Sequence, residues 1–78
     1  MNKARRKKIQ HALDLLQQAT EILAEVNDEE DEAFNNLPES IQESERGAQM
    51  EEYMETIDDA INEVDDIKAN LEEIVEGS

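Results

Sequence analysis

Apolar residues recur at intervals of three and four through the second half of the chain. From Glu51 the sequence divides into the blocks EEYMETI, DDAINEV, DDIKANL and EEIVEGS, each of which opens with two acids. The apolar positions form two sets three residues apart, Met50, Ile57, Val64 and Leu71 in the first and Tyr53, Ala60, Ile67 and Ile74 in the second. Because a seven-residue apolar repeat is typical of helices in coiled coils or bundles, we predict a helix over about residues 44–76.

The first half of the chain carries the same period less regularly. Its two apolar sets are Ile9, Leu16 and Leu23 and, with smaller side chains, Ala12, Ala19, Val26 and Ala33. We predict a helix over about residues 3–35. Negative charge is unfavourable near the C-terminal end of a helix, so the acid run 28–32 leaves an alternative, in which the helix breaks at Asn27 and Asp28 caps a new one. We favour one continuous helix.

Residues 36–43 are predicted to form the turn between the helices. The single proline, Pro38, suits the first turn of a short helix over about residues 38–42, because its missing N–H would be unpaired there in any case. Such a helix would direct Leu37 and Ile41 into the end of the core.

The start of the second helix has two candidate caps and one unexpected glycine. Ser40 and Ser44 are both suited to cap a helix N-terminus. Gly47 falls in the first helical turn, where glycine costs up to about 1 kcal/mol relative to alanine. A glycine at such a position indicates that another part of the chain approaches it closely.

Folded back at about residue 41, the chain forms an antiparallel hairpin about 40 Å long. Small residues then meet large ones, with Ala12 facing Leu71 and Ala19 facing Val64, as in interdigitating layers. Glu30 faces Tyr53 and can accept a hydrogen bond from its hydroxyl, unless Glu30 turns outward instead. The predicted fold is all-α, a two-helix hairpin that resembles a coiled coil.

Two helices cannot surround their own apolar stripes. We expect Leu15, Ile22, Ile61 and Val75 to stay partly exposed on a single hairpin. A second copy is the most economical cover, so we predict a homodimer with a four-helix core, with a different protein on this strip as the alternative. The residues assigned to the core or the dimer interface are Leu15, Ile22, Phe34, Tyr53, Met54, Ile61 and Val75.

Charge is very unevenly distributed. The 78 residues carry a net charge of −15, yet five of the seven Lys and Arg lie in the first eight residues, here named the basic segment (Lys3, Arg5, Arg6, Lys7 and Lys8). The predicted hairpin places this segment beside Glu72, Glu73 and Glu76, where we expect a network of ion pairs. The only other cations are Arg46 and Lys68. We expect Arg46 to pair with Glu43 or with the acid run 28–32.

The composition narrows the classes of partner and compartment. A surface this acidic repels nucleic acid and anionic lipid, so we expect neither nucleic-acid nor membrane binding. No apolar run approaches the roughly 20 residues that span a bilayer, and the basic start does not resemble a secretory signal. The chain has no cysteine, which suits a reducing cytosol, and we expect a cytoplasmic protein.

The sequence offers no recognisable catalytic or metal-binding constellation. A di-metal carboxylate bundle needs Glu-x-x-His, but the only histidine, His11, has Lys8 and Asp14 at the corresponding positions. The acid run 28–32 lacks the glycine and the spacing of a calcium loop. We expect His11 at the surface, no cofactor, no metal and no enzymatic activity.

One segment carries a resemblance. The sequence AFNNLPESIQESERG (33–47), preceded by a basic start, a helix and an acid run and followed by an acidic repeat helix, resembles a group of small acidic proteins of anaerobic gut-type bacteria and their phages or prophages. The resemblance covers nearly the whole chain and implies a phage-related origin rather than a mechanism. If the protein is phage-encoded, its compartment is the host cytosol.

Two functions follow as hypotheses. The first is a non-catalytic interaction module whose acidic helical surface engages a basic host protein, as an inhibitor of host defence does. The second is a small structural or assembly protein of a phage or mobile element, whose acidity serves only solubility. The candidate partner-binding residues are Asp28, Glu29, Asp31, Glu32, Glu39, Glu43, Arg46, Glu51, Glu52, Asp58 and Asp59.

Overall fold

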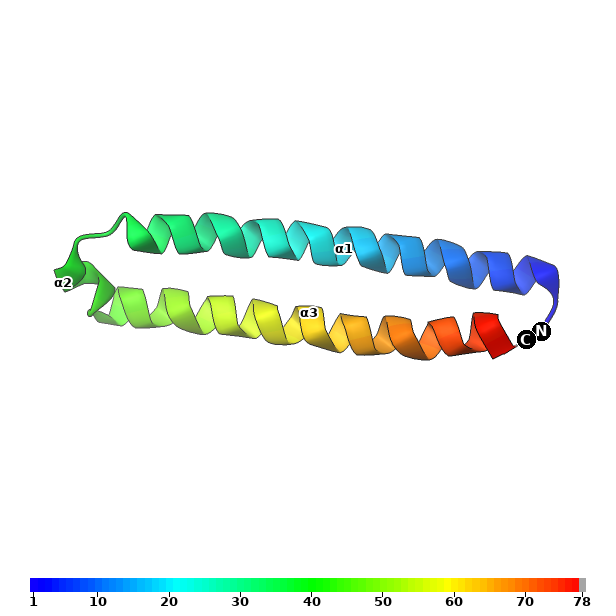
Figure 1. Cartoon of the computed structure of the whole chain (residues 1–78). Coiled ribbons are helices and arrows are strands. Elements are labelled where there is room, and N and C mark those ends of the chain that lie inside the picture. Colours follow the sequence, from blue (N-terminus) through cyan, green and yellow to red (C-terminus); the bar gives the residue numbers. More distant parts are fainter. Residues whose placement is uncertain (78) are drawn as a thin grey trace.

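The computed structural model describes residues 1–77 and contains two long helices joined by a short one (Figure 1). Helix α1 spans Lys3–Asn35, α2 spans Glu39–Gln42 and α3 spans Glu45–Gly77. Helices α1 and α3 lie side by side and antiparallel, which confirms the predicted all-α hairpin. Helix α1 runs without a break through Asn27 and the acid run, as the favoured alternative predicted.

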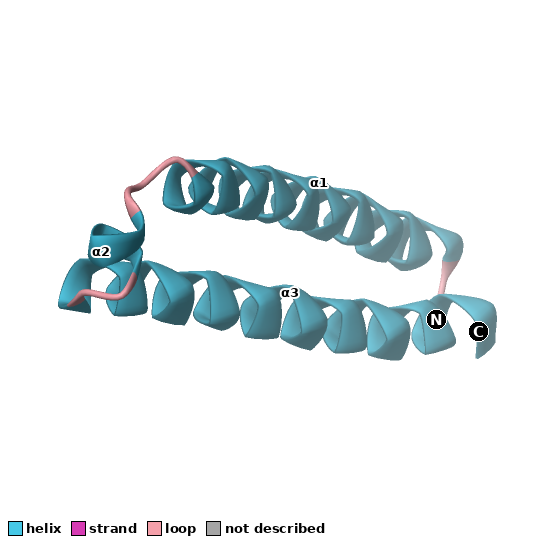
Figure 2. Cartoon of the chain, turned by 60° about the vertical axis from the view of Figure 1, so that its left-hand side comes forward, coloured by secondary structure: helices cyan, strands magenta, loops and turns pink. Residues whose placement is uncertain are grey.

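The hairpin is a thin rod, with the start of α1 and the end of α3 at one tip and α2 at the other (Figures 1 and 2). Its principal extents are 58 × 15 × 12 Å. The expected length of about 40 Å is too short, because a helix of 33 residues already measures about 50 Å at 1.5 Å per residue. In residues 1–77 no apolar side chain is fully buried, so the two helices alone do not enclose a core.

Side chains satisfy backbone groups at both ends of α1. At its start the Asn2 Oδ1 atom accepts a hydrogen bond from the Arg5 backbone N–H at 2.9 Å. At its end the Gln42 side-chain amide donates to the carbonyl oxygens of Phe34 and Leu37, at 3.0 and 3.1 Å. The Phe34 carbonyl lies in the last turn of α1 and also accepts from the Leu37 N–H at 3.1 Å, and the Leu37 carbonyl lies just beyond the helix. Gln42 therefore adds side-chain hydrogen bonds at the end of α1 and ties α2 to it.

Helix α2 is the short helical turn that the proline predicted. Pro38 directly precedes it, and the Pro38 carbonyl accepts from the Ile41 N–H at 2.9 Å and the Gln42 N–H at 3.0 Å. Leu37 and Ile41 are half-buried at the end of the hairpin. Ser44 directly precedes α3, and its hydroxyl donates to the Ile41 carbonyl.

The close approach predicted at Gly47 is confirmed. Gly47 is one of the few buried residues of the described chain. A Cβ atom at this position would lie 1.9 Å from the Gln42 carbonyl oxygen and 2.5 Å from its carbonyl carbon. Since both contacts are with backbone, any larger residue at position 47 would force α2 away from α3.

We call the residues through which α1 and α3 face each other the seam. Seam residues recur strictly at intervals of three and four along each helix. The seam comprises Ile9, Leu13, Leu16, Thr20, Leu23, Asn27, Glu30 and Phe34 on α1 and Gly47, Met50, Met54, Ile57, Ile61, Val64, Lys68, Leu71 and Val75 on α3, all of them half-buried or buried. The first apolar set predicted for each helix is therefore correct. The interhelical hydrogen bonds from Asn27 to Met54 and from Lys68 to Gln17 also agree with the expected register to within about two residues.

The second predicted set is wrong in both helices, except at Ala60. The seam uses the residue four positions after each member of the first set, and the residue three positions after it is exposed at every place but Ala60, which is half-buried. The exposed members are Ala12, Ala19, Val26 and Ala33 on α1 and Tyr53, Ile67 and Ile74 on α3, while Ile61 and Val75, expected to be partly exposed, are half-buried seam residues. The observed rotation of α1 brings Leu13 and Phe34 into the seam in place of alanines. Larger apolar side chains remove more surface from water, at about 25 cal/mol per Å².

Three predicted polar contacts do not form. The Tyr53 hydroxyl accepts a hydrogen bond from Gln49 on its own helix at 2.9 Å instead of bonding to Glu30. Within residues 1–77, no ion pair joins Lys7 or Lys8 to the acids at the end of α3, and Arg46 forms none with Glu43 or the acid run. The basic segment does lie at the same end of the rod as those acids (Figure 1).

Candidate functional site

The seam divides the outside of the hairpin into two long flanks. The acidic flank, named for its α3 part, is made of the residues one position after the first set and after Glu30, namely Gln10, Gln17, Ala24 and Asp31 on α1 and Glu51, Asp58, Asp65 and Glu72 on α3. The apolar flank is made of Ala12, Leu15, Ala19, Ile22 and Val26 on α1 and Tyr53, Ile67 and Ile74 on α3.

Contacts across the seam show that the α1 and α3 parts of the acidic flank lie on one side. The Lys68 ammonium donates a hydrogen bond to Gln17 of α1 and forms an ion pair with Asp65 of α3 at 3.5 Å. Farther along, Asp31 of α1 and Asp58 of α3 line the same hollow. Because the helices are antiparallel, residues at equal offsets from the seam share a side, so the two halves of the apolar flank also lie together, on the opposite side.

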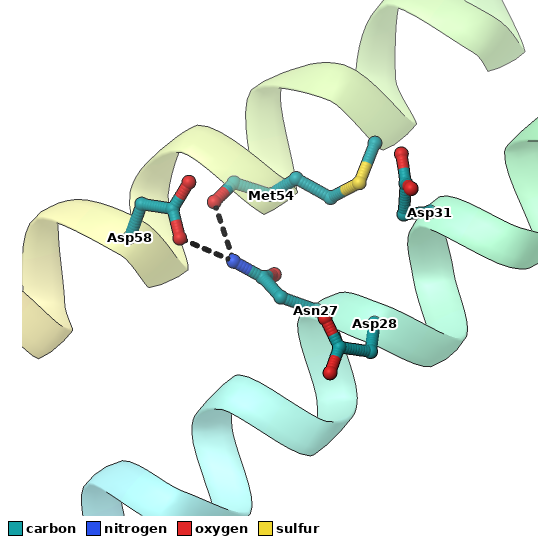
Figure 3. A pocket seen from close by; sticks show the side chains of 5 residues that line it. All are labelled: Asn27, Asp28, Asp31, Met54 and Asp58. Carbon is teal, nitrogen blue, oxygen red and sulfur yellow. Dashed lines mark hydrogen bonds between the residues drawn. The ribbon is translucent and has the colours of Figure 1, made fainter.

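The hollow on the acidic flank is centred on Asn27 (Figure 3). The Asn27 Nδ2 atom donates to the Met54 carbonyl at 3.1 Å and to the Asp58 carboxylate at 2.8 Å, while its Oδ1 atom has no hydrogen-bond partner among the described residues. Asp28 and Asp31 complete the lining. Despite these three carboxylates, no group of His, Asp or Glu in the described part of the chain has the arrangement of a metal site.

The candidate partner-binding residues are all exposed, and all lie in the half of the rod nearest α2. The structure brings Asp28, Asp31 and Asp58 together at the hollow. The others are spread along the outer faces of the helices and around α2. Every aspartate and glutamate of the chain except Glu30 is exposed, so the negative charge is presented to solvent over the whole rod.

Sequence reasoning missed the polar residues of the seam. Thr20 is only 6% exposed, with its hydroxyl donating to the Gln17 carbonyl at 2.9 Å, and Asn27 and Lys68 lie in the seam beside it. The signal was present, because Thr20 and Asn27 stand seven residues apart between Leu13 and Phe34. On α1, choosing the set with the largest apolar residues, rather than the set with the most apolar residues, would have found Thr20 and Asn27. On α3 the same rule selects the set with Tyr53 and Ile67, so it does not find Lys68.

The assigned core and interface residues divide between the seam and the outside. Phe34, Met54, Ile61 and Val75 are half-buried in the seam. The others are exposed on the apolar flank, and they are Leu15 at 51%, Ile22 at 61% and Tyr53 at 55%. The flank therefore keeps large apolar side chains in water along both helices.

The remaining candidate, His11, is exposed on α1, as expected. In the described residues, neither long helix has a stretch apolar enough to cross a membrane. Comparison of the chain with models of known protein families, with curated proteins and with solved structures gave no match.

Proposed function

We propose that the protein is a non-catalytic interaction module whose acidic helical surface binds a basic surface on another protein. The observation that carries the proposal is that every aspartate and glutamate except Glu30 is exposed. Leaving Arg6 aside, the cations of residues 1–77 form one ion pair with these carboxylates, Lys68–Asp65. Carboxylates that have no cation within the chain remain available to one from outside. A basic partner would gain both a faster encounter and a fixed orientation from them.

The half of the rod nearest α2 is the proposed contact region. It holds the acid run 28–32, Glu39 and Glu43 around α2, and the first acidic pairs of α3, whereas the opposite end carries the basic segment. Charge thus distinguishes the two ends, and a basic partner is attracted to the α2 end. The resemblance to small proteins of gut-type bacteria and their phages favours a host protein as the partner, with inhibition of a defence nuclease as the biological role.

The same proposal includes a dimer of hairpins as the acting form. A lone hairpin has no fully buried apolar side chain in residues 1–77, and small domains without disulfides or metals usually need oligomerisation to be stable. A dimer would also present two acidic α2 ends to one partner or to two.

The test compares two charge-matched variants. In one, Glu51, Glu52, Asp58 and Asp59 at the α2 half are changed to the amides; in the other, Asp66, Glu72, Glu73 and Glu76 at the opposite half are changed likewise. Binding to a purified, basic DNA-cleaving nuclease is measured by competition with duplex DNA at about 50 and 500 mM salt. We expect the first set to weaken binding at least ~10-fold more than the second, and the salt increase to abolish most of it.

Equal losses in the two variants would contradict the proposed region, because binding would then follow total charge alone. Undiminished binding by the α2-half variant would contradict the acidic surface altogether. Assembly of the wild-type protein into large homo-oligomers that persist at high salt would favour the structural or assembly role instead.

A further inference from the structure

Exposed apolar side chains recur along one flank of the hairpin. Leu15 and Ile22 of α1 are 51% and 61% exposed, and Tyr53 and Ile67 of α3 are 55% and 49% exposed. On α1 these larger residues alternate with alanines at intervals of three and four. This is the spacing of a packed seam, so α1 carries the pattern for packing against a second helix besides α3.

The surface of the lone hairpin is larger than that of a finished domain. A globular chain of 8.9 kDa exposes about 4,800 Å² by the usual scaling of surface with mass. The hairpin exposes 5846 Å². The excess of about 1,000 Å² is close to what each partner contributes to a stable protein–protein interface, about 800 Å².

We propose that the apolar flank packs against the apolar flank of a second copy of this chain, with the two hairpins antiparallel. The twofold axis then runs perpendicular to the rod at the level of Ala19, and α1 stacks on α1 of the partner subunit. The result is a four-helix bundle in which every neighbouring pair of helices is antiparallel. The inference rests on the dimer proposed above and adds its interface and its orientation.

The position of the flank along the rod supports the location of the axis. The two large exposed residues of the flank on α1, Leu15 and Ile22, stand on either side of Ala19, which is also the midpoint of α1. A half-turn about this level brings Leu15 of one copy close to the level of Ile22 of the partner subunit. Ala12 then lies opposite Val26 of the partner subunit, so that a small residue meets a larger one, as closely packed layers require.

The distribution of charge supports the antiparallel orientation. In that arrangement Arg5 and Lys8, which continue the spacing of the apolar flank seven residues before Ala12 and Leu15, lie over the α2 end of the partner subunit, and the acidic flank of each copy stays exposed. The parallel arrangement would instead place two basic segments side by side and two acid runs side by side. Because like charges repel and opposite charges attract, the antiparallel dimer is favoured electrostatically, most strongly at low salt.

The acidic flank does not compete for this role. It carries Asp31, Glu51, Asp58 and Asp65, and a twofold contact through it would bring these carboxylates against their own copies. Burial of unpaired charge is strongly unfavourable. A different protein on the apolar flank remains as an outcome of the experiment.

The experiment measures mass in solution by sedimentation equilibrium for the full chain and for two variants. The wild-type mass is expected at twice the 8.9 kDa of one chain at micromolar concentration. Ile22→Glu places a charge in the proposed interface but on an exposed site of the lone hairpin, and is expected to raise the dimer dissociation constant at least ~100-fold. Ala24→Glu adds the same charge two residues away on the acidic flank and is expected to leave the mass unchanged.

Each result has a distinct meaning, with helical content checked by circular dichroism. A wild-type mass of one chain overturns the dimer, and thereby favours a different protein on the flank. A dimer that survives Ile22→Glu overturns this interface while leaving the dimer in place. Loss of dimer in Ala24→Glu as well as in Ile22→Glu assigns the effect to charge in general and overturns the flank.

The orientation is tested with single cysteines, since the natural chain has none. At the proposed axis, Ala19→Cys places two thiols opposite each other and is expected to form a disulfide-linked dimer under mild oxidation. In Ala12→Cys the two thiols are about 21 Å apart along the bundle, which no disulfide can span. Equal cross-linking of the two variants overturns the antiparallel orientation.

Discussion

The closed end of the hairpin, where α2 joins α1 to α3, and the middle of the seam are stabilised by different kinds of contact. At the closed end, backbone meets backbone at Gly47, and the Gln42 side chain caps α1. In the middle of the seam, polar side chains of Thr20, Asn27 and Lys68 stand where apolar ones would pack better. The closed end has no space for a larger side chain at Gly47, whereas the middle of the seam keeps polar residues that reduce its stability.

The difference shows that the closed end fixes the turn of the chain, whereas the polar residues of the seam fix how α1 is aligned with α3. Backbone contacts at the closed end fix how the chain turns, because a carbonyl group cannot move aside without shifting α2. In a seam of repeating residues, by contrast, many registers bury similar apolar area. A polar residue such as Asn27, bonded to Met54 and Asp58 across the seam, favours one register at some cost in stability.

The largest expected effect is at Gly47. Gly47→Ala should lower the free energy of unfolding by about 3 kcal/mol, because the new methyl group would overlap the Gln42 carbonyl and displace α2 together with its cap. Urea unfolding at one fixed protein concentration measures this. The matched control is Gly77→Ala, where a Cβ meets nothing within 4 Å, and a change below about 0.5 kcal/mol is expected. Similar losses in both variants would contradict the backbone contact.

The second prediction concerns the cap. Gln42→Ala removes two hydrogen bonds to the Phe34 and Leu37 carbonyls and should lower the free energy of unfolding by about 1.5 kcal/mol. Faster amide hydrogen exchange is expected in the last turn of α1 and in α2, but not at the far end of the rod. Gln18→Ala, at an exposed site of α1, serves as the control. Uniform exchange changes along the rod would show that Gln42 does not act as a local cap.

The sequence predicted the closed end well because its signals are local. A lone proline and a glycine inside a helical turn each have few physical explanations, and the short helix α2 and the close approach at Gly47 agree with them. Ser44 does precede α3, but its hydroxyl donates to the Ile41 carbonyl. The unbroken α1 also follows from the repeat. What Gln42 does was missed, since a glutamine next to a turn gives no sign of which distant carbonyls it reaches.

The rotation of the helices could not be read from the repeat alone. Apolar residues occupy four positions per heptad on α1 and three on α3, and two packed helices can bury only about two on each. The set with Tyr53 and Ile67 is unbroken by polar residues, but the structure uses the set with Met54 and Lys68. Tyr53, Ile67 and Ile74 are therefore exposed and form the α3 part of the apolar flank.

The third prediction is a gain in stability, at Asn27 in the middle of the seam. Asn27→Leu should raise the free energy of unfolding by about 1 kcal/mol, because it removes an acceptor with no partner and adds apolar burial. The exposed Asp58 would bond to water instead. Asn62→Leu, at an exposed site of α3, should give no such gain. A lower stability for Asn27→Leu would mean that the two bonds across the seam outweigh their cost.

The smallest effect is expected at Lys68, whose side chain is 15% exposed beside a 54% exposed Asp65. An ion pair with a half-exposed partner contributes little, so the apolar stem accounts for most of what Lys68 adds. In about 500 mM salt, where self-repulsion of the acidic chain is screened, Lys68→Met should raise the free energy of unfolding by about 0.5 kcal/mol. At low salt the gain should shrink, because one of the few cations of α3 is lost. Asp65→Asn is the control, since it removes the ion pair and keeps the stem. If Lys68→Met is the more destabilising of the two in high salt, the hydrogen bond from Lys68 to Gln17 stabilises the seam, and the middle of the rod resembles its closed end more than the polar residues suggest.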